Sequence, residues 1–390
     1  VHCLSPWAAE LPRIVGVDLA GAGRKFKKHT GLGCDSFRPQ WFSWLSEELL
    51  DQYARLLMVI ENLGVWPEMI SVLLVAQIPK ADGGRRPIGL LPTLVRVWEK
   101  IRKPVMESWR TTVVRSYNHA AKGKSSETAA WLQAHHAELA TCRGGFSAAL
   151  LIDLAKAFEM VKLELVWMAG LRLHCPPRIL RLELEAFAFK RRLMFLGVVA
   201  APIHTLSAIL AGGSFAIDAL FLVMSGVCDK ILVEEPDAGL CLFVDDLTIQ
   251  VTGQNSVMVG AQLDRTSRRL ADLEDSLGLV VSRGKEGSKT IALHSSHAKW
   301  RSGHNQQAMW RLGKRMQGLG VSMVRQAKLL GVDFSAGKKV KRMVQCGRIR
   351  KVQDKIGRMR QLGKKAARHV VRTGAGPSRR YGASVYGATN

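Results

Sequence analysis

The chain has 390 residues, 47% of them hydrophobic, which is enough to bury a sizeable core in two or three lobes and excludes a disordered tail. Lys and Arg total 57 against 32 Asp and Glu, and this net charge of +25 points to a polyanionic partner such as nucleic acid. The excess is concentrated, since the last 90 residues hold 22 Lys and Arg and two acidic residues, Asp333 and Asp354. We expect a basic C-terminal module that grips a nucleic-acid backbone.

The cysteine content bears on the cellular compartment. Seven cysteines are scattered along the chain with no Cys-x-x-Cys pair, so we expect a reducing compartment and no zinc site. No signal-peptide pattern opens the sequence. The chain begins at Val1 and ends on Gly-Ala-Thr-Asn, and we interpret it as a fragment of a longer reading frame.

The first part of the chain predicts an irregular segment, a helix and a cationic hairpin. We expect residues 1–40 to be irregular and residues 46–62 to form a helix with one apolar face. A buried strand over residues 71–78 then leads through Asp-Gly-Gly into a second extended segment. Lys80 and Arg86 flank this turn and could close over an anionic ligand such as a triphosphate. A plain surface hairpin explains the same residues equally well.

A predicted strand over residues 146–153 stays apolar until its last residue, Asp153, and a helix over residues 156–170 follows. Such a strand delivers its final carboxylate to an edge of the sheet. Capping the helix that follows is an equally good role for Asp153, so both interpretations stay open.

Residues 193–217 carry no formally charged side chain, and this run is long enough to imitate a membrane span. Pro202, Gly212 and Gly213 interrupt it. We therefore expect a buried strand pair, a glycine turn and a core helix, with no membrane partner.

Residues 240–251 form two short apolar runs joined by Asp245-Asp246, a pattern that predicts a β-hairpin with acid at its tip. Adjacent aspartates repel each other unless a partner compensates them, and a hard divalent cation that takes oxygen ligands is such a partner. A solvated turn, in which Asp is common, is the alternative interpretation.

The remaining residues predict further helices and strands. We expect a helix over residues 255–277, strands over 278–282 and 290–293 that pair behind it, and a short strand over 329–334. A basic helical stretch follows over residues 338–373. A solvated charged face is the default for such a helix, but its density of like charge favours a nucleic-acid contact.

Asp153 and the Asp245-Asp246 pair can converge on one pair of metal ions, with the cationic hairpin available for phosphates. These are the groups that two-metal phosphoryl transfer requires. Carboxylates clamp two Mg²⁺ ions, an attacking 3′-hydroxyl is activated at one ion, and the leaving pyrophosphate is stabilised at the other. The chemistry needs no histidine, cysteine or serine triad.

Seven blocks follow one another in a fixed order along most of the chain. They are residues 78–92, 119–130, 153–158, 211–216, 243–246, 277–289 and 330–333. In this order they resemble the fingers block, the template-side segment, motifs A, B, C and D, and the strand before the thumb of reverse transcriptases from non-LTR, LINE-like retroelements.

The resemblance implies an α+β right-hand polymerase fold, with fingers, a palm built on an antiparallel sheet backed by helices, and a helical thumb. It implies fingers over residues 41–145, a palm over residues 146–334 and a basic, truncated thumb over residues 335–390. The irregular residues 1–40 would precede the fingers.

The resemblance also implies the catalytic residues. Asp153 and Asp245 would bind the metals directly, and Asp246 would complete the acidic site. The cofactors would be two Mg²⁺ ions, with Mn²⁺ as the alternative. Lys289 could protonate the pyrophosphate, or Lys285 in its place, because an insertion blurs the alignment here.

Four more residues would bind the incoming nucleotide. Lys80 and Arg86 would hold its triphosphate, and Gly212 would let nucleotide and template approach the backbone closely. Phe158 would be the steric gate, a ring packed where the 2′-hydroxyl of a ribonucleotide would lie, unless it is an ordinary core residue.

Three positions depart from the family pattern. Phe243 stands where many members have Tyr, Ala211 where many have Gln, and Glu159 where Asp is frequent. None of these changes removes a metal-binding carboxylate, so we expect a competent site, with altered nucleotide or template contacts at Ala211.

The partners implied are an RNA template, a DNA primer and dNTPs, with nuclear or cytoplasmic location, while protein partners stay unknown. A viral RNA-dependent RNA polymerase is one alternative, but such enzymes usually carry Gly before the Asp pair and no bulky ring at the gate. A catalytically inactive nucleic-acid-binding protein derived from a retroelement is the other. The intact acidic residues argue against decay.

Overall fold

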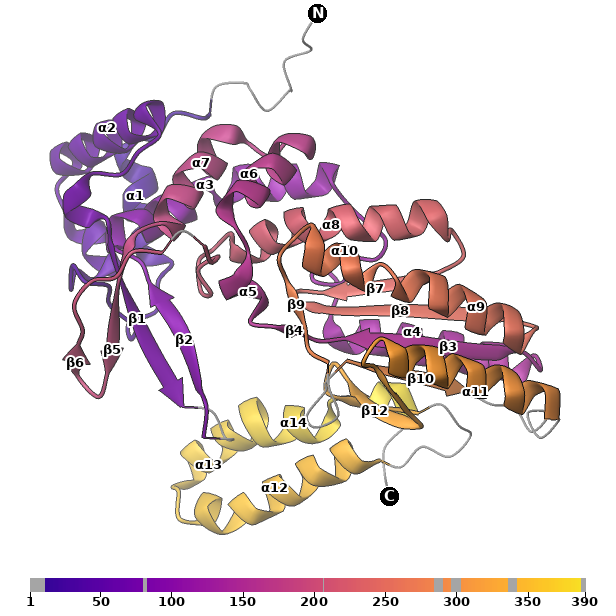
Figure 1. The fold of residues 1–390 in the computed structure, drawn as a ribbon. Helices are drawn as coiled ribbons and strands as arrows, with labels where there is room; N and C mark the ends of the chain where they lie inside the picture. The colour runs from indigo at the N-terminus through magenta and orange to yellow at the C-terminus, as the bar shows by residue number, and fades with distance from the viewer. Residues whose placement is uncertain are drawn as a thin grey trace, which may run out of the picture. The chain divides into compact units, whose positions relative to one another are not determined.

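The computed structural model describes residues 11–79, 83–205, 207–283, 290–295, 303–335 and 342–386 (Figure 1). The chain forms two compact units, each assembled from separate stretches of sequence. Unit 1 is made of Val1–Val114, Lys156–Gly226 and Leu277–Leu279, and unit 2 of Arg115–Ala155, Val227–Ser276 and Val280–Asn390. The contiguous ranges expected for fingers, palm and thumb therefore do not coincide with these units.

Unit 1 contains a mixed four-stranded sheet in the order β2-β1-β5-β6, in which β1 is antiparallel to β2 and parallel to β5. Its strands are β1 Val72–Pro79, β2 Arg85–Leu90, β5 Lys190–Phe195 and β6 Val198–Val199. Its helices are α1 Gly16–Arg24, α2 Glu47–Leu63, α3 Thr93–Thr112, α5 Ala157–Met160, α6 Leu163–Arg172 and α7 Pro177–Phe187, with a 3₁₀ turn over Pro39–Trp44.

Unit 2 contains a mixed five-stranded sheet in the order β11-β10-β3-β8-β7, and two short strand pairs, β4 with β9 and β12 with β13. Its strands are β3 Phe146–Ile152, β4 Leu154–Ala155, β7 Gly239–Phe243, β8 Asp246–Gly253, β9 Val280–Val281, β10 Ile291–Ser295, β11 Ser322–Val324, β12 Gln326–Leu329 and β13 Val332–Ser335. Its helices are α4 Ser126–Cys142, α9 Ser256–Ser267, α10 Leu270–Asp275, α11 Gly303–Gly318, α12 Met343–Arg360, α13 Lys364–Val370, α14 Gly376–Arg380 and α15 Ala383–Tyr386.

Helix α8, Ala216–Glu234, contributes residues to both units. Helices and mixed sheets together agree with the α+β class expected from the sequence.

Elements with strong local signals form as predicted. Helix α2 begins after Ser46, whose hydroxyl accepts a hydrogen bond from the N–H of Leu49, and ends at Gly64 in the left-handed conformation, with φ of +68°. The hairpin predicted over residues 240–251 is β7 and β8. Capping residues and strand alternation act over a few neighbouring positions, which is why these predictions are confirmed.

The prediction that residues 1–40 are irregular is wrong for α1. Its glycines read as helix breakers in the sequence, but they allow close packing. A β-carbon on Gly16 would lie 2.7 Å from Oδ1 of Asp51 in α2, and one on Gly23 would lie 2.7 Å from the carbonyl oxygen of Pro39. Tertiary packing therefore stabilises a helix that local propensity disfavours.

Three further predictions are corrected by the structure. The two strands expected to pair with each other form ladders with other strands, β9 with β4 and β10 with β3, and the segments are joined by the hydrogen bond from the N–H of Thr290 to the carbonyl oxygen of Ser282 at 3.2 Å. The helix expected over residues 255–277 divides into α9 and α10, whereas the described part of the basic stretch 338–373 contains α12 and α13 and is helical as expected. The strand expected over residues 329–334 is a hairpin, β12 and β13, with Leu330 and Gly331 in its turn.

The uncharged run 193–217 forms parts of β5 and α8 and the whole of β6, so the strand pair and the helix expected there are present. The strand pair is largely exposed, however, and the prediction that it is buried is wrong. Among the helices that the structure describes, none is both long and apolar enough to cross a bilayer.

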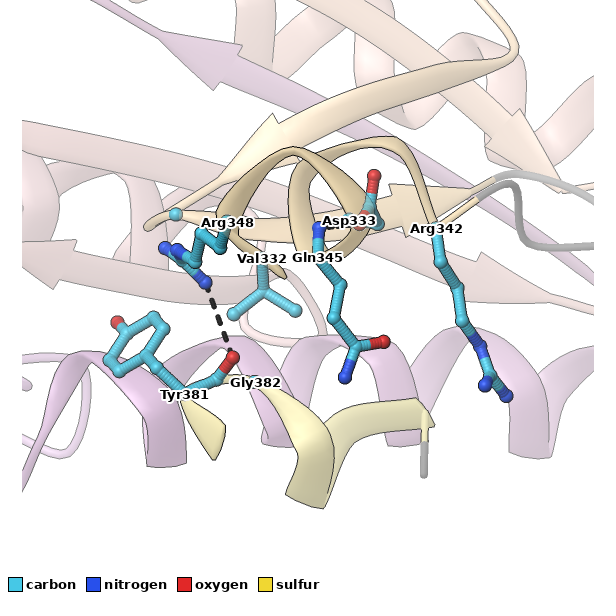
Figure 2. Close-up of a pocket in the computed structure, with 8 residues that line it drawn as sticks. Val332, Asp333, Arg342, Gln345, Arg348, Tyr381 and Gly382 are labelled. Atoms are coloured by element: carbon cyan, nitrogen blue, oxygen red, sulfur yellow. Dashed lines mark hydrogen bonds between the residues drawn. The ribbon is translucent and has the colours of Figure 1, made fainter. Parts of the chain in front are cut away.

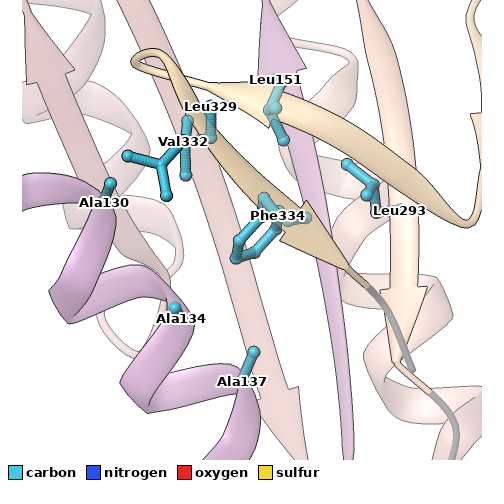
Figure 3. Packing of buried hydrophobic residues seen from close by; sticks show 9 residues of the cluster. Ala130, Ala134, Ala137, Leu151, Leu293, Leu329, Val332 and Phe334 are labelled. Atoms are coloured by element: carbon cyan, nitrogen blue, oxygen red, sulfur yellow. The ribbon is translucent and has the colours of Figure 1, made fainter. Parts of the chain in front are cut away.

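One face of the unit 2 sheet packs against α4. Alanines on α4 let the helix approach the sheet closely, and the ring of Phe334 fills the space between them (Figure 3). The buried cluster consists of Ala130, Ala134, Ala137, Ala149, Leu151, Leu293, Leu329, Val332 and Phe334. Helix α4 and the β12–β13 hairpin are thus held on the same side of β3.

A buried ion pair stands in the core of unit 1. Glu61 of α2 accepts hydrogen bonds from the guanidinium of Arg102 and, at 2.7 Å, from the indole N–H of Trp98, both on α3. Trp98 is fully buried, and its ring contacts that of Trp66 edge to face at 5.4 Å. Such a pair is costly to break from one side, because the remaining charge stays buried.

Replacing Glu61 with Gln should therefore lower the free energy of unfolding by about 3 kcal/mol, since Arg102 would keep its charge without a counter-ion. Urea denaturation followed by circular dichroism measures this. Glu107→Gln is the matched control, because Glu107 forms an exposed pair with Lys103 at 3.8 Å and should cost less than about 0.5 kcal/mol. Equal effects of the two changes would contradict the assignment.

Candidate active site

The acidic hairpin ends in a two-residue turn. The last pair of β7 and β8 joins Phe243 to Asp246, which leaves Val244 and Asp245 between the strands. Val244 has φ of +62°, a left-handed conformation that β-branched residues rarely adopt. Backbone strain of this kind persists where the surrounding structure determines the conformation, and it is concentrated at functional sites.

The register of β3 and β8 brings Asp153 to the same end of the sheet as this turn. Ile152 at the end of β3 pairs with Leu247 of β8, and antiparallel partners lie about 4.5–5.5 Å apart between α-carbons. Asp153 follows Ile152, and Asp246 precedes Leu247. Continuing the ladder by one residue therefore sets the two aspartates opposite each other, and the backbone positions of all three acidic residues lie at one edge.

Segments far along the chain hold the backbone at Asp153. Ser282 donates its N–H to the carbonyl oxygen of Asp153 at 2.9 Å, and the Asp153 N–H donates to Oγ1 of the buried Thr290 at 3.1 Å. Sequence reasoning singled out neither residue. Thr290 directly follows Lys289, the last residue of the block that resembles motif D. Lys289 and its alternative Lys285 lie outside the described residues.

The three carboxylates suit Mg²⁺, a hard cation that takes oxygen ligands. Within the described residues, no three His, Cys, Asp or Glu side chains are gathered into a group that could hold a metal. Mg²⁺ is usually bound through one or two carboxylates together with water and substrate phosphates. Asp153, Asp245 and Asp246 are residues of the type that this mode of binding uses, in which the substrate completes the coordination.

Three of the regions predicted to bind nucleotide meet in unit 1. The N–H of Ile209 donates to the carbonyl oxygen of Phe158 at 2.8 Å. The N–H of Gly89 in β2 donates to the carbonyl oxygen of Ala211 at 3.2 Å. Gly212 has φ of +113°, and a β-carbon there would lie 3.3 Å from the carbonyl oxygen of Gly89. This position therefore requires glycine. The ring of Phe158 is half-buried.

Of the two cations predicted to bind a triphosphate, Arg86 lies among the described residues and is exposed. Arg86 belongs to β2, where it pairs with Ile78. The guanidinium of its neighbour Arg85 stacks on the ring of Phe195 at 3.5 Å, and strand alternation directs Arg86 to the other face. Lys80 lies outside the described residues.

Lys124, in the predicted template-side segment, has a structural contact that the sequence did not reveal. Its ammonium group donates to the carbonyl oxygens of Arg115, Ser116 and Asn118 at 3.3, 3.0 and 2.8 Å. This segment lies along β7, because Leu242 accepts from the N–H of His119 and donates to the carbonyl oxygen of Tyr117, both at 2.8 Å. Lys124 therefore supports the edge of the acidic hairpin.

The strand before the predicted thumb is joined to α12 through Asp333. The buried carboxylate of Asp333 accepts from the N–H of Val344 at 3.0 Å and of Gln345 at 3.2 Å, in the first turn of the helix. Figure 2 shows Asp333 beside Gln345. Arg348 donates to the carbonyl oxygen of Tyr381 at 3.2 Å, and its guanidinium lies 4.7 Å from the centre of the Tyr381 ring. The Asp333 contact joins α12 to the β12–β13 hairpin, and the Arg348 contact joins α12 to the segment that follows α14.

No protein-family model matches this chain, and no curated protein matches it. The function is therefore inferred from the residues and from the contacts described above.

Replacing Lys124 with Met should lower the free energy of unfolding by about 1–3 kcal/mol, because three carbonyl oxygens lose their donor. Lys122→Met is the matched control in the same loop, since Lys122 is exposed and should change stability by less than about 0.5 kcal/mol. Urea denaturation of both variants measures this. If Lys124 served only to bind nucleic acid, both variants would unfold like the wild type, and that result would contradict the structural role.

Proposed function

We propose that this chain is an RNA-directed DNA polymerase, the reverse transcriptase of a non-LTR retrotransposon. The observation that carries the proposal is the register of β3 and β8, which ends with Ile152 opposite Leu247 and so brings Asp153 beside the Asp245-Asp246 turn. The order of the seven sequence blocks supports the same conclusion.

In this proposal Asp153, Asp245 and Asp246 hold two Mg²⁺ ions at the edge of the unit 2 sheet. The ions, when bound, would supply activation of the primer 3′-hydroxyl and charge stabilisation for the leaving pyrophosphate. The β3–β8 ladder and the contacts from Ser282 and Thr290 to Asp153 keep the acidic residues in place. Such preorganisation matters because small displacements of catalytic groups slow phosphoryl transfer.

Four further residues would bind the incoming dNTP. Arg86, together with Lys80, would bind the triphosphate, and the backbone at Gly212 would lie against the nucleotide. Phe158 would exclude a 2′-hydroxyl by steric conflict. Lys289 would donate a proton to the pyrophosphate. Four residues separate Phe158 from Asp153 in the sequence, which supports a common role in one reaction.

The basic C-terminal residues would bind the RNA template and DNA primer. Helices α12, α13 and α14 lie in the 90-residue stretch that holds 22 Lys and Arg against two acidic residues. Phosphate contacts from such a surface supply affinity without reading sequence. Asp333 would keep α12 attached to the β12–β13 hairpin.

Primer extension on an RNA template tests the proposal. Asp153→Asn and Asp245→Asn should each reduce dNTP incorporation at least about a hundredfold, the scale of losing one group that stabilises charge in the transition state. Asp237→Asn is the control, because it removes an exposed carboxylate just before β7 with the same change of charge. It should leave incorporation within about twofold of the wild type.

Two results would contradict the proposal that the chain is a polymerase. One is wild-type incorporation by both Asp variants. The other is binding of RNA on a filter with no incorporation by the wild-type chain, which would identify a nucleic-acid-binding scaffold.

Replacing Phe158 with Ala should admit ribonucleotides, because the ring that blocks the 2′-hydroxyl is removed. The preference for dNTP over rNTP, as the ratio of kcat/KM values, should fall by roughly ten- to a hundredfold, the range for pocket contacts of this size. Phe158→Tyr keeps the ring and should keep the preference. Unchanged discrimination in the Ala variant would assign Phe158 to core packing alone.

A further inference from the structure

The β5–β6 hairpin of unit 1 carries large apolar side chains on its surface. Those that are exposed on it and on the segment just after it are Leu193, Phe195, Leu196, Val198, Val199 and Ile203. At the tip the exposed fraction reaches 85% for Leu196 and 72% for Val198. The hairpin projects away from helices α2, α3 and α7 of the same unit (Figure 1). A contiguous apolar patch on a folded chain marks a surface that binds a partner.

The tip of the hairpin is a two-residue turn. Phe195 pairs with Val198, which leaves Leu196 and Gly197 between the strands, with φ of +49° and +83°. Two positive φ values belong to the turn that Asn-Gly favours, and leucine is unfavourable at its first position. The most exposed apolar side chain of the hairpin therefore stands where the local conformation disfavours it, as expected of a side chain that serves a contact.

Hydrogen bonds hold the base of the hairpin to unit 1. Arg191 and Ile203 donate their N–H groups to each other's carbonyl oxygens, at 2.8 and 2.9 Å. The guanidinium of Arg191 donates to the carbonyl oxygens of Phe187 and Ala208, both at 3.1 Å. Strand β5 also forms a parallel ladder with β1. The hairpin is thus an anchored projection that can keep its shape against a partner.

A guanidinium group lies on each face of the hairpin. That of Arg85 in β2 stacks on the ring of Phe195 at 3.5 Å. Strand alternation directs Arg192 to the opposite face from Phe195, and its Nε donates to the carbonyl oxygen of Ala200 at 3.2 Å. A guanidinium has five N–H donors, and neither of these contacts uses more than one of them. Both groups are therefore held in place with donors left for an anionic ligand.

The charge of this region indicates the class of partner. Among the described residues of the β1–β2 and β5–β6 hairpins and their flanks, 71–79, 83–90 and 190–205, five are Lys or Arg and none is Asp or Glu. Guanidinium groups match the geometry of phosphate, and leucine side chains enter between base steps in proteins that distort a duplex. A membrane surface also attracts cationic and apolar groups, but these ranges contain no Trp or Tyr, the residues enriched at that interface. Nucleic acid is the better match.

We propose that the β5–β6 hairpin is a wedge that opens double-stranded nucleic acid. Leu196 and Val198 enter at the end of a duplex and displace its last base pair. Arg85 and Arg192, on opposite faces, each hold phosphates of one separated strand. Unstacking a base step costs free energy, which the burial of the apolar tip and the phosphate contacts offset. In a polymerase the wedge would open folded template RNA, and this use alone rests on the proposed function.

Fluorescence of 2-aminopurine tests the wedge without catalysis. The full chain is added, without Mg²⁺ or dNTP, to an RNA duplex with two single-stranded tails at one end and 2-aminopurine in the last base pair before the tails. This base brightens when it is unstacked. Saturating wild-type protein should raise the fluorescence to at least about half that of the free single strand, since a wedge that offsets the unstacking cost opens the pair in about half of the complexes or more. A duplex with 2-aminopurine at its centre should stay dark.

Changes at the tip separate the wedge from folding. The double variant Leu196→Asn, Val198→Thr removes the apolar tip, while Asn-Gly favours the turn and Thr favours the strand. It should bind the forked duplex within about fivefold of the wild type, because phosphate contacts dominate affinity. It should nevertheless lose the rise in fluorescence. Leu63→Ser, which removes an exposed leucine of α2, should behave as the wild type.

Changes of charge test the phosphate contacts. Arg85→Gln and Arg192→Gln should each weaken binding of the forked duplex and reduce the slope of log affinity against log salt concentration by about one. Arg55→Gln is the matched control, because it removes an exposed guanidinium of α2. Its slope should equal that of the wild type, and equal slopes in all three variants would contradict the phosphate contacts.

The inference is overturned if the wild type leaves the fork dark, or if the double variant brightens it as the wild type does. A dark fork, together with capture on anionic phospholipid vesicles by the wild type and not by the double variant, would assign the hairpin to a membrane surface instead.

Primer extension distinguishes failure of the wedge from failure of the proposed function. Both chains should extend a primer equally on unstructured RNA, whereas a stable hairpin in the template should stop only the double variant. Opening of the fork with no incorporation on either template would defeat the proposed function alone. Incorporation with a dark fork would defeat the wedge alone.

Discussion

The ladder between β3 and β8 is the interaction on which unit 2 depends. Side chains alternate along a strand with a period of two, so a slip by one residue would turn the buried set out of the core. The same slip would carry Asp153 away from the face of Asp246. Because Leu151 packs against α4 in one register and not in the next, hydrophobic burial also decides where the acidic residues lie. The register that buries the apolar side chains of β3 is therefore also the register that sets the positions of the acidic residues.

In unit 1 the geometry around the 211–214 loop depends on the close approach of backbone segments. A β-carbon on Gly89 would lie 1.9 Å from Cδ1 of Leu210, and one on Gly212 would lie 3.3 Å from the carbonyl oxygen of Gly89. The 211–214 loop is thus packed against β2 on one side and against Glu99 and Glu183 on the other.

The elements that the sequence predicted well are those with local signals. Helix α2 has a cap at each end, and the acidic hairpin combines apolar alternation with a turn of two residues. Helix α1 was missed because its stability comes from packing that glycines permit, which propensity counts against it. The wrong pairing of β9 and β10 has a similar origin, because proximity in the chain says little about which strands share hydrogen bonds.

By itself the sequence determined where acidic residues interrupt apolar strands, where the charge gathers and which residue types could serve a metal or a nucleotide. These properties depend on a residue and its few neighbours. Only the tertiary structure decided three contacts. Thr290 accepts a hydrogen bond from the N–H of Asp153, Lys124 donates to carbonyl oxygens of its own loop, and Glu99 accepts from Ser214. Such contacts are chosen by the free energy of the whole fold, which no short pattern contains.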